Sequence, residues 1–314
     1  MPARSDGTMT SKFLTGAVFT ALIACSAGGT SDGSSVVPLG PGAVSGTPPP
    51  IGSEGSSPPP VPTPSADVSP MFGDEDVEAE DACDTTLPVV FRDFSQTHPD
   101  FEMAFSGDEP RLHLVQPQLG MDGKPVFLDG VGCPRDNQRQ RECNTGFNPT
   151  QAVITSAESF AQWYRTLDGT NFAFDREIEL SETALGSGVY TFASNAFFPL
   201  TVAEGFGETP PGQGKNFLFT TEVHSQFTYV AGQVFTFRGD DDLWIFINDR
   251  LALDLGGMHG ERTASIDFDA QAVELGITAG TAYSMDVFHA ERHTSQSNFY
   301  METNIACFSP GIPR

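Results

Sequence analysis

Basic residues are scarce in this sequence. Lys and Arg together number 16 against 41 Asp and Glu, which gives a formal net charge of −25 over 314 residues. Nucleic acids and anionic lipid surfaces are both recognised through basic patches, so this charge argues against either as a partner. A surface that binds calcium or sugars remains compatible with it.

The sequence also lacks an apolar run long enough to span a bilayer. The apolar stretch from Phe13 to Ala24 has the length of a signal-peptide core. It ends in Leu-Ile-Ala-Cys, which resembles a bacterial lipobox. We therefore expect residues 1–24 to be a lipoprotein signal peptide and Cys25 to be lipidated, with an ordinary secretory signal as the alternative. The start is either Met1 or Met9.

This leader predicts an exported protein of the bacterial cell envelope, at the outer membrane or cell surface. Membrane contact is expected through the N-terminal lipid only. Residues 25–84 are rich in Pro, Gly and Ser and then become acidic, as in PPPVPTPSADVSP and GDEDVEAEDACD. Such a segment has little to bury, so we expect a disordered linker that holds the following domain away from the membrane.

Cysteine is sparse, with five residues in the chain. Lipidation of Cys25 leaves four, and an even number in an exported protein predicts two disulfides. Three pairings are possible. We favour Cys133 with Cys143, which closes a short ring, and Cys83 with Cys307, which joins the two ends of the folded region. A zinc site is the alternative, although no pair has the tight spacing of zinc ribbons.

Familiar catalytic patterns are missing. The sequence contains no Ser-His-Asp order, no phosphate-binding loop and no evident cysteine nucleophile. His289 and His293 lie four residues apart in a segment that reads as a strand, where this spacing is about 13 Å, so shared zinc binding is disfavoured. Acidic residues for glycoside hydrolysis exist, but there is no separate catalytic domain. We expect a protein that is not an enzyme.

Residues 85–309 read as one folded domain, mainly β. Short segments with β-branched or aromatic alternation follow one another, among them LPVVFRDF, GVYTFAS, QVFTFRG and LWIFIN. One short helix is expected at residues 155–167, with a capping box of Thr155 and Glu158. Many short strands and one helix predict an antiparallel β-sandwich or barrel. A tight hairpin is expected at Asp249-Arg250.

Three adjacent carboxylates, Asp240, Asp241 and Asp242, are the most unusual local feature. They form what we call the aspartate run, and they directly precede the apolar segment LWIFIN. Like charges in contact repel, so the run either faces water on a turn or surrounds a cation. A rigid β-scaffold that presents several oxygen ligands suits Ca²⁺.

The segment GDDDLWIFINDRLALDLGGMHG is very similar to the signature of the fibro-slime domain, which slime-mould and bacterial surface proteins share. The resemblance extends to LPVVFRDFSQTHPDFE, FAQWYRTLDGTN and VFHAERHTSQSNFYMET. This domain in turn resembles the protective-antigen-type β-sandwich superfamily, which includes flocculin-type lectins. The resemblance implies an antiparallel β-sandwich of the protective-antigen type.

In the flocculin-type lectins, a pair of Asp side chains holds Ca²⁺, an Asn from a later loop completes the site, and sugar hydroxyls bind the ion. Asp240 and Asp241 match that pair, Asn298 is the candidate Asn, and Asp242 stands where many relatives have Gly. The expected metal ligands are Asp240, Asp241, Asn298 and Asp242. The expected contacts to a bound ligand are His259, Trp244 and Glu291.

Two functions are compatible with this pattern. The first is a cell-surface lipoprotein whose Ca²⁺-dependent β-sandwich binds a surface or matrix polysaccharide in adhesion. The alternative is a non-catalytic structural or protein–protein module of the extracellular matrix, in which Ca²⁺ is only structural. Exposed aromatic rings near Asp240 would favour the first, because sugar rings pack on them. A buried aspartate cluster without a cleft would favour the second.

Overall fold

The computed structural model describes residues 85–105, 107–135, 143 and 149–311. The predictions for the signal peptide, for lipidation of Cys25, for the linker and for Cys83 fall outside these residues. Within the described ranges, no helix has the length and apolar character needed to cross a membrane.

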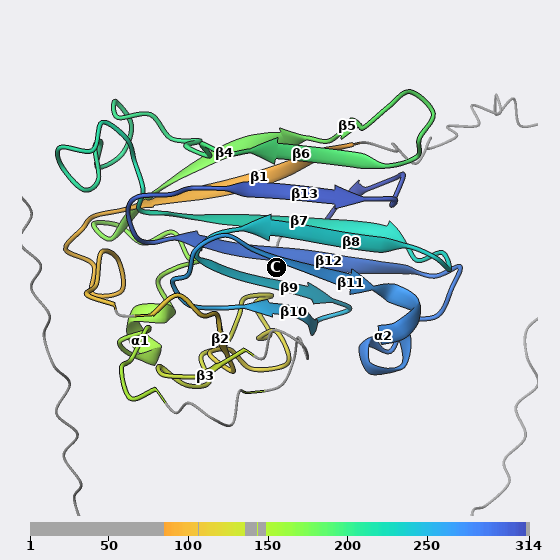
Figure 1. The fold of residues 1–314 in the computed structure, drawn as a ribbon, viewed down its shortest axis with the longest axis horizontal. Coiled ribbons are helices and arrows are strands. Elements are labelled where there is room, and N and C mark those ends of the chain that lie inside the picture. Colours follow the sequence, from red (N-terminus) through yellow and green to blue (C-terminus); the bar gives the residue numbers. More distant parts are fainter. Residues whose placement is uncertain (1–84, 106, 136–142, 144–148, 312–314) are drawn as a thin grey trace, which may run out of the picture. The chain divides into compact units, whose positions relative to one another are not determined.

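The described chain forms a β-sandwich of two open antiparallel sheets, as predicted (Figure 1). The larger sheet has the order β10-β9-β12-β7-β1-β4, and β14 pairs with β7 beside it. Its strands are β1 (Thr86–Phe94), β4 (Asn171–Glu179), β7 (Phe219–Thr228), β9 (Asp242–Ile247), β10 (Arg250–Leu255), β12 (Ala282–Glu291) and β14 (Ser309–Pro310).

The smaller sheet has the order β11-β8-β13-β6-β5. Its strands are β5 (Ser181–Glu182), β6 (Tyr190–Ser194), β8 (Val234–Gly239), β11 (Arg262–Asp267) and β13 (Phe299–Thr303). A separate two-stranded sheet pairs β2 (Arg111–Leu112) with β3 (Cys133–Pro134). The helices are α1 (Ala157–Phe160) and α2 (Phe268–Leu275).

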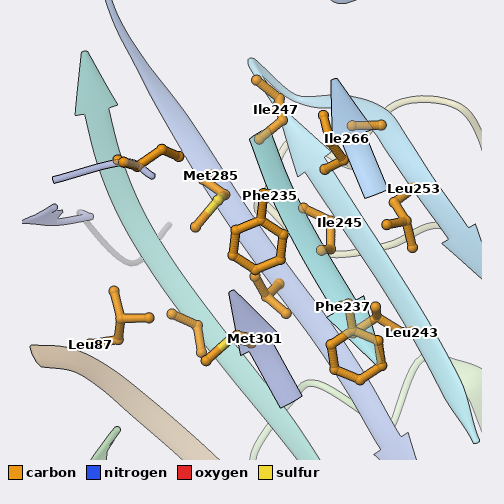
Figure 2. Packing of buried hydrophobic residues seen from close by; sticks show 14 of the residues in the cluster. Leu87, Phe235, Phe237, Leu243, Ile245, Ile247, Leu253, Ile266, Met285 and Met301 are labelled. Atoms are coloured by element: carbon orange, nitrogen blue, oxygen red, sulfur yellow. The ribbon is translucent and has the colours of Figure 1, made fainter. Parts of the chain in front are cut away.

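The main hydrophobic core lies between the two sheets. Phe235, Phe237 and Met301 of the smaller sheet pack toward Ile245 and Met285 of the larger one (Figure 2). Because side chains alternate along a strand, every second residue of β9 contributes to this core.

The other residues of β9 enter a second core on the outer face of the larger sheet. Trp244 and Phe246 pack there with Phe160 and Trp163, and the Phe160 and Trp244 rings lie 5.7 Å apart. Strand β9 is therefore buried on both faces. This explains why LWIFIN is apolar without alternation, as in strands covered on both sides.

The helices differ in detail from the sequence expectation. Helix α1 begins one residue later than expected, because Ser156 is the N-cap and forms a capping box with Ser159 in place of Thr155 and Glu158. It is also much shorter than the expected 155–167, since the α-helix ends at Phe160 and residues 161–164 form turns. Helix α2 was not predicted. Its N-cap is Asp267, whose side chain accepts from the Ala270 amide, and it ends at Gly276 in the left-handed conformation.

The β9–β10 hairpin turns one residue earlier than expected. Its central residues are Asn248 and Asp249, with φ of 53° and 61°. Positive φ at both positions is the type I′ geometry that matches the twist of paired strands, and Asn and Asp tolerate it.

The disulfide between Cys133 and Cys143 is present, with the Cα atoms 5.4 Å apart. Cys307 is disulfide-bonded as well. Its predicted partner Cys83 lies outside the described residues, so that pairing stays a prediction.

Candidate functional site

The aspartate run lies at the junction of β8 and β9, where its three side chains take different directions. Asp240 and Asp241 precede β9, and Asp242 is its first residue. Asp241 has a φ of 53°, in the left-handed region that non-glycine residues seldom adopt. Such conformations often mark functional positions.

Asp240 is bound to Asn298. Its Oδ1 accepts from the Asn298 backbone amide at 2.6 Å, and its Oδ2 accepts from the Asn298 side-chain amide at 2.5 Å. Asp240 is almost fully buried, and this burial raises its pKa. The structure therefore brings Asp240 next to Asn298, the residue 58 positions later that the family resemblance proposed for the same site.

Asp241 is held by three backbone amides. Its Oδ1 accepts from the His259 amide at 3.3 Å, and its Oδ2 accepts from the amides of Arg292 and His293 at 2.8 and 3.0 Å. Burial raises the pKa of Asp241 to about 8. Arg292 acts against this shift, and the neighbouring charge of Asp242 adds to it.

Asp242 points away from the other two and forms a buried ion pair. Its Oδ2 accepts from Arg292 Nε at 2.7 Å, with both side chains fully buried, and its Oδ1 accepts from the Gly257 amide. Both oxygens are thus engaged. The structure gives no support to the prediction that Asp242 is a metal ligand, because a guanidinium already offsets its charge.

Arg292 connects the larger sheet to the described residues between β1 and β4, which cover the outer face of that sheet and which we call the covering segment. Its Nη1 donates to the carbonyl oxygens of Asp100 and Val153, and its guanidinium lies 4.6 Å from the Trp163 ring centroid. Burial alone would lower the pKa of Arg292, but the carboxylates of Asp242 and Asp241 outweigh it and raise the pKa. No sequence motif identified Arg292 as part of the site. The available indication was a single arginine directly after an apolar strand.

Glu291 is fully buried, and neither of its carboxylate oxygens has a hydrogen-bond partner. Burial raises its pKa well above the usual range, and the charges of Asp241 and Asp240 raise it further. The expected surface contact through Glu291 is wrong. Glu291 and Arg292 point to opposite faces of the sheet, as successive residues of an extended chain do.

Trp244 is also fully buried and cannot present its ring to a ligand. It lies in the second core, and its Nε1 donates to Asp254 Oδ1 at 3.1 Å. Because β9 is covered on both faces, neither orientation of Trp244 would have reached solvent. The expected ligand contact through this residue is therefore wrong.

A pocket of about 270 Å³ opens over the first two aspartates. We call it the aspartate pocket. Its lining includes Asp240, Asp241 and His259, as the sequence suggested for these three. The rest of its wall is formed by Phe105 and Asp108 from the covering segment and by residues 293–296 after β12. His259 is buried, and burial lowers its pKa, so its imidazole is neutral at neutral pH.

The residues around this pocket are suited to a hard cation. Asp240, Asp241 and Glu291 are three neighbouring buried carboxylates, and the one adjacent guanidinium is taken by Asp242. The Glu291 carboxylate is fully buried and does not itself line the pocket, so it adds negative charge close to the two aspartates. The oxygens of the three carboxylates do not all lie within 4.8 Å of one another, so a common ion would require side-chain rotation.

No family model matches the chain. Among curated proteins, it is 34% identical over 225 residues to protein psiD of Dictyostelium discoideum, covering 70% of this chain and 41% of psiD. It is 38% identical over 234 residues to protein psiQ of the same organism, covering 71% of this chain and 21% of psiQ. The chain thus spans less than half the length of these relatives.

Solved structures match only weakly. The PA14 domain of the MpAFP antifreeze protein is 13% identical, with a TM-score of 0.25, over 40% of this chain and 78% of that one. The PA14 sugar-binding domain from an RTX adhesin is 10% identical, with a TM-score of 0.23, over 39% and 75%. These TM-scores are too low to support a conclusion about fold or ligand. The sequence matches alone make the psi proteins of Dictyostelium homologues of this chain.

Proposed function

We propose that the domain of residues 85–309 is a non-catalytic β-sandwich that binds Ca²⁺ at the aspartate pocket and, through the ion, a hydroxyl-rich ligand such as a surface or matrix glycan. One observation carries this proposal. Asp240 and Asp241 are buried side by side in the lining of an open pocket, and the buried carboxylate of Glu291 lies close enough for their charges to raise its pKa.

The charge of this cluster has to be offset in some way. An unpaired buried ion costs several kcal/mol even after the protein relaxes around it. In the ion-free protein the raised pKa values of Asp241 and Glu291 limit that cost by favouring their protonated forms. A divalent cation would offset the same charge without protonation.

The donor set favours Ca²⁺ over other ions. Carboxylate and amide oxygens are hard ligands, and Ca²⁺ accepts six to eight of them in flexible geometry, whereas Mg²⁺ requires a nearly ideal octahedron. Asp240, Asp241 and Asn298 would hold the ion from the protein side, and the nearby charge of Glu291 would add to the attraction. A bound Ca²⁺ would supply positive charge and open coordination positions for hydroxyl oxygens.

The wall of the aspartate pocket supports a sugar as the ligand. Asp108, Thr294, Ser295 and Gln296 provide hydrogen-bonding side chains around a half-buried ring, Phe105. The Phe105 ring offers an apolar surface on which a sugar ring can pack, and the surrounding polar side chains can orient its hydroxyl groups by hydrogen bonds. The volume is just below the range of roughly 300–1,000 Å³ typical of small-molecule sites, which limits the ligand to a short saccharide end.

The cellular setting remains part of the proposal. A lipid on Cys25 and the Pro-rich linker would hold the domain at the surface of a bacterial envelope, where polysaccharide is the available partner. Metabolic labelling with a fatty acid, in parent and Cys25→Ser proteins, tests the anchor. Label in both proteins would contradict lipidation at this cysteine.

Calorimetric titration of Ca²⁺ tests the ion site directly. We expect binding in the parent, loss of binding in Asp241→Asn, and unchanged binding in Asp175→Asn, whose side chain is exposed on β4. Absence of heat in the parent, together with an unchanged melting temperature on adding Ca²⁺, would refute the site. If Ca²⁺ binds, a glycan array probed with Ca²⁺ and with a chelator tests the ligand.

The structural module is the second candidate, and one observation favours it. The Asp241 carboxylate joins the loop that carries His259 to the residues that follow β12. An ion bound to this carboxylate would strengthen the same connection and would thus have a structural role. In that case Ca²⁺ would raise the melting temperature, but no glycan would bind, and Gln296→Ala would change neither property.

A further inference from the structure

A second cluster of metal-binding side chains lies on the β2–β3 hairpin, outside the aspartate pocket. The ligand atoms of His113, Cys133 and Cys143 all lie within 4.8 Å of one another. Among the described residues, no other group of three His, Cys, Asp or Glu side chains is this close. Both cysteines are half-buried and His113 is exposed, so the cluster is accessible from solvent.

Backbone pairing places the two sulfurs beside His113. Cys133 pairs with Leu112, the residue before His113, and Cys143 forms a bridge with Arg135. Gly132 has a φ of 60°, and a Cβ there would lie 2.5 Å from the Leu112 carbonyl oxygen. A larger residue would therefore push the hairpin apart at the position next to Cys133.

The backbone of His113 is attached to the core. Its φ is 66°, in the left-handed region, and its backbone amide donates to Asp254 Oδ2 at 3.1 Å. Asp254 in turn accepts from the buried indole of Trp244. The backbone of His113 is therefore held in an uncommon conformation by a contact to the core, and such conformations cluster at functional positions.

We propose that this cluster is a redox-gated site for a soft divalent ion such as Zn²⁺. With the Cys133–Cys143 disulfide closed, His113 is the remaining ligand of the three, and one imidazole is too weak a site. With the disulfide open, two thiolates and an imidazole from the same small area become available, and a solvent water would complete four-coordination.

The gating step is a thiol–disulfide exchange with an external dithiol. A dithiol thiolate attacks one sulfur, the Cys133–Cys143 bond breaks, and the second dithiol sulfur resolves the mixed disulfide. The dithiol is oxidised to a disulfide, and the protein gains two electrons and two protons as two thiols. Each thiol releases its proton when the ion binds. The ion then closes the same ten-residue interval that the disulfide closed.

Cobalt(II) serves as a spectroscopic probe of this site. The full chain is reduced with a phosphine under inert gas, the phosphine is removed, and Co²⁺ is added. Reduction opens every disulfide, so the double variant Cys133→Ser, Cys143→Ser is the reference. We expect a thiolate-to-cobalt charge-transfer band in the parent, displaced by Zn²⁺, and no such band in the reference or in the oxidised parent.

His113→Asn tests the third ligand. Asn tolerates the left-handed backbone of residue 113, so the oxidised variant should keep the parent's melting temperature and circular dichroism. We expect its Co²⁺ affinity to fall at least about tenfold. An equal band in the reference, or unchanged affinity in a folded His113→Asn protein, would overturn the proposal. Neither result depends on the Ca²⁺ site, because Asp241→Asn should leave the thiolate band intact.

Discussion

The pKa of Asp241 makes the stability of the ion-free protein depend on pH in a defined direction. Burial raises this pKa from 3.8 to about 8. At a pH below the pKa of Asp241 in the unfolded chain, the folded and unfolded states both hold the proton, and the free energy of unfolding is unaffected. As the pH rises toward the pKa of Asp241 in the folded protein, the carboxyl group ionises first in the unfolded state. The free energy of unfolding therefore falls as the pH rises.

The size of this loss follows from the same interval. One pKa unit corresponds to about 1.36 kcal/mol, so the interval from 3.8 to about pH 7 corresponds to a loss of roughly 4 kcal/mol. Other buried carboxylates with raised pKa values, such as Asp254 at about 6, contribute in the same direction. The difference in pH dependence between the parent and Asp241→Asn gives the part of the stability loss that is due to Asp241.

Urea denaturation at about pH 4.5 and about pH 7, with a chelator present, measures this difference. Asn offers one acceptor where Asp offers two, so the variant loses about 1–3 kcal/mol at both pH values, and only the pH dependence is compared. We expect a much smaller fall with pH in Asp241→Asn, and a parent-like fall in Asp175→Asn. Ca²⁺ should reduce the fall in the parent. Equal pH dependence in parent and Asp241→Asn would refute this reasoning.

Three further predictions concern stability. Arg292→Met should lower the free energy of unfolding by about 3–5 kcal/mol in urea denaturation, because Asp242 is left charged and unpaired, and adding Asp242→Asn should recover part of it. Burial acts to lower the pKa of His224, but its hydrogen bonds to Asp286 and Glu222 outweigh burial and raise the pKa. His224→Gln should therefore destabilise the protein most at acidic pH, where His224 is charged, and least at alkaline pH, as urea denaturation would measure. Trp244→Ala should cost about 3–5 kcal/mol by the same assay; weaker glycan binding in a fully stable variant would contradict its place in the core.

The sheet architecture was predictable because its determinants are local. Short apolar segments bounded by turn residues gave the strands, and Asn248-Asp249 could adopt the turn that joins β9 to β10. The burial of β9 on both faces was not predictable in the same way. It depends on a covering segment that lies some 80 residues earlier in the chain and packs Phe160 against Trp244.

The site was predictable only where sequence neighbours stay spatial neighbours. Asp240 and Asp241 share a pocket, and the resemblance supplied Asn298. The partner of Asp242 is Arg292, 50 positions away, and no local pattern identifies it. Glu291 is different, because strand alternation alone separates it from Arg292 and could have directed it inward. Helix α2 was missed since the strand pattern before it continues to Asp267.

The contacts of Arg292 also determine when the site can form during folding. This side chain reaches the carbonyl oxygen of Asp100, 192 positions earlier, and Val153, 139 positions earlier. Contacts of such sequence separation have a high loop-closure entropy and form late. A nascent chain that has completed β9 therefore carries Asp242 before its counter-ion exists. We expect the aspartate cluster to be the last part of the domain to acquire its native environment, and the region where an interrupted chain is most exposed to chaperones and proteases.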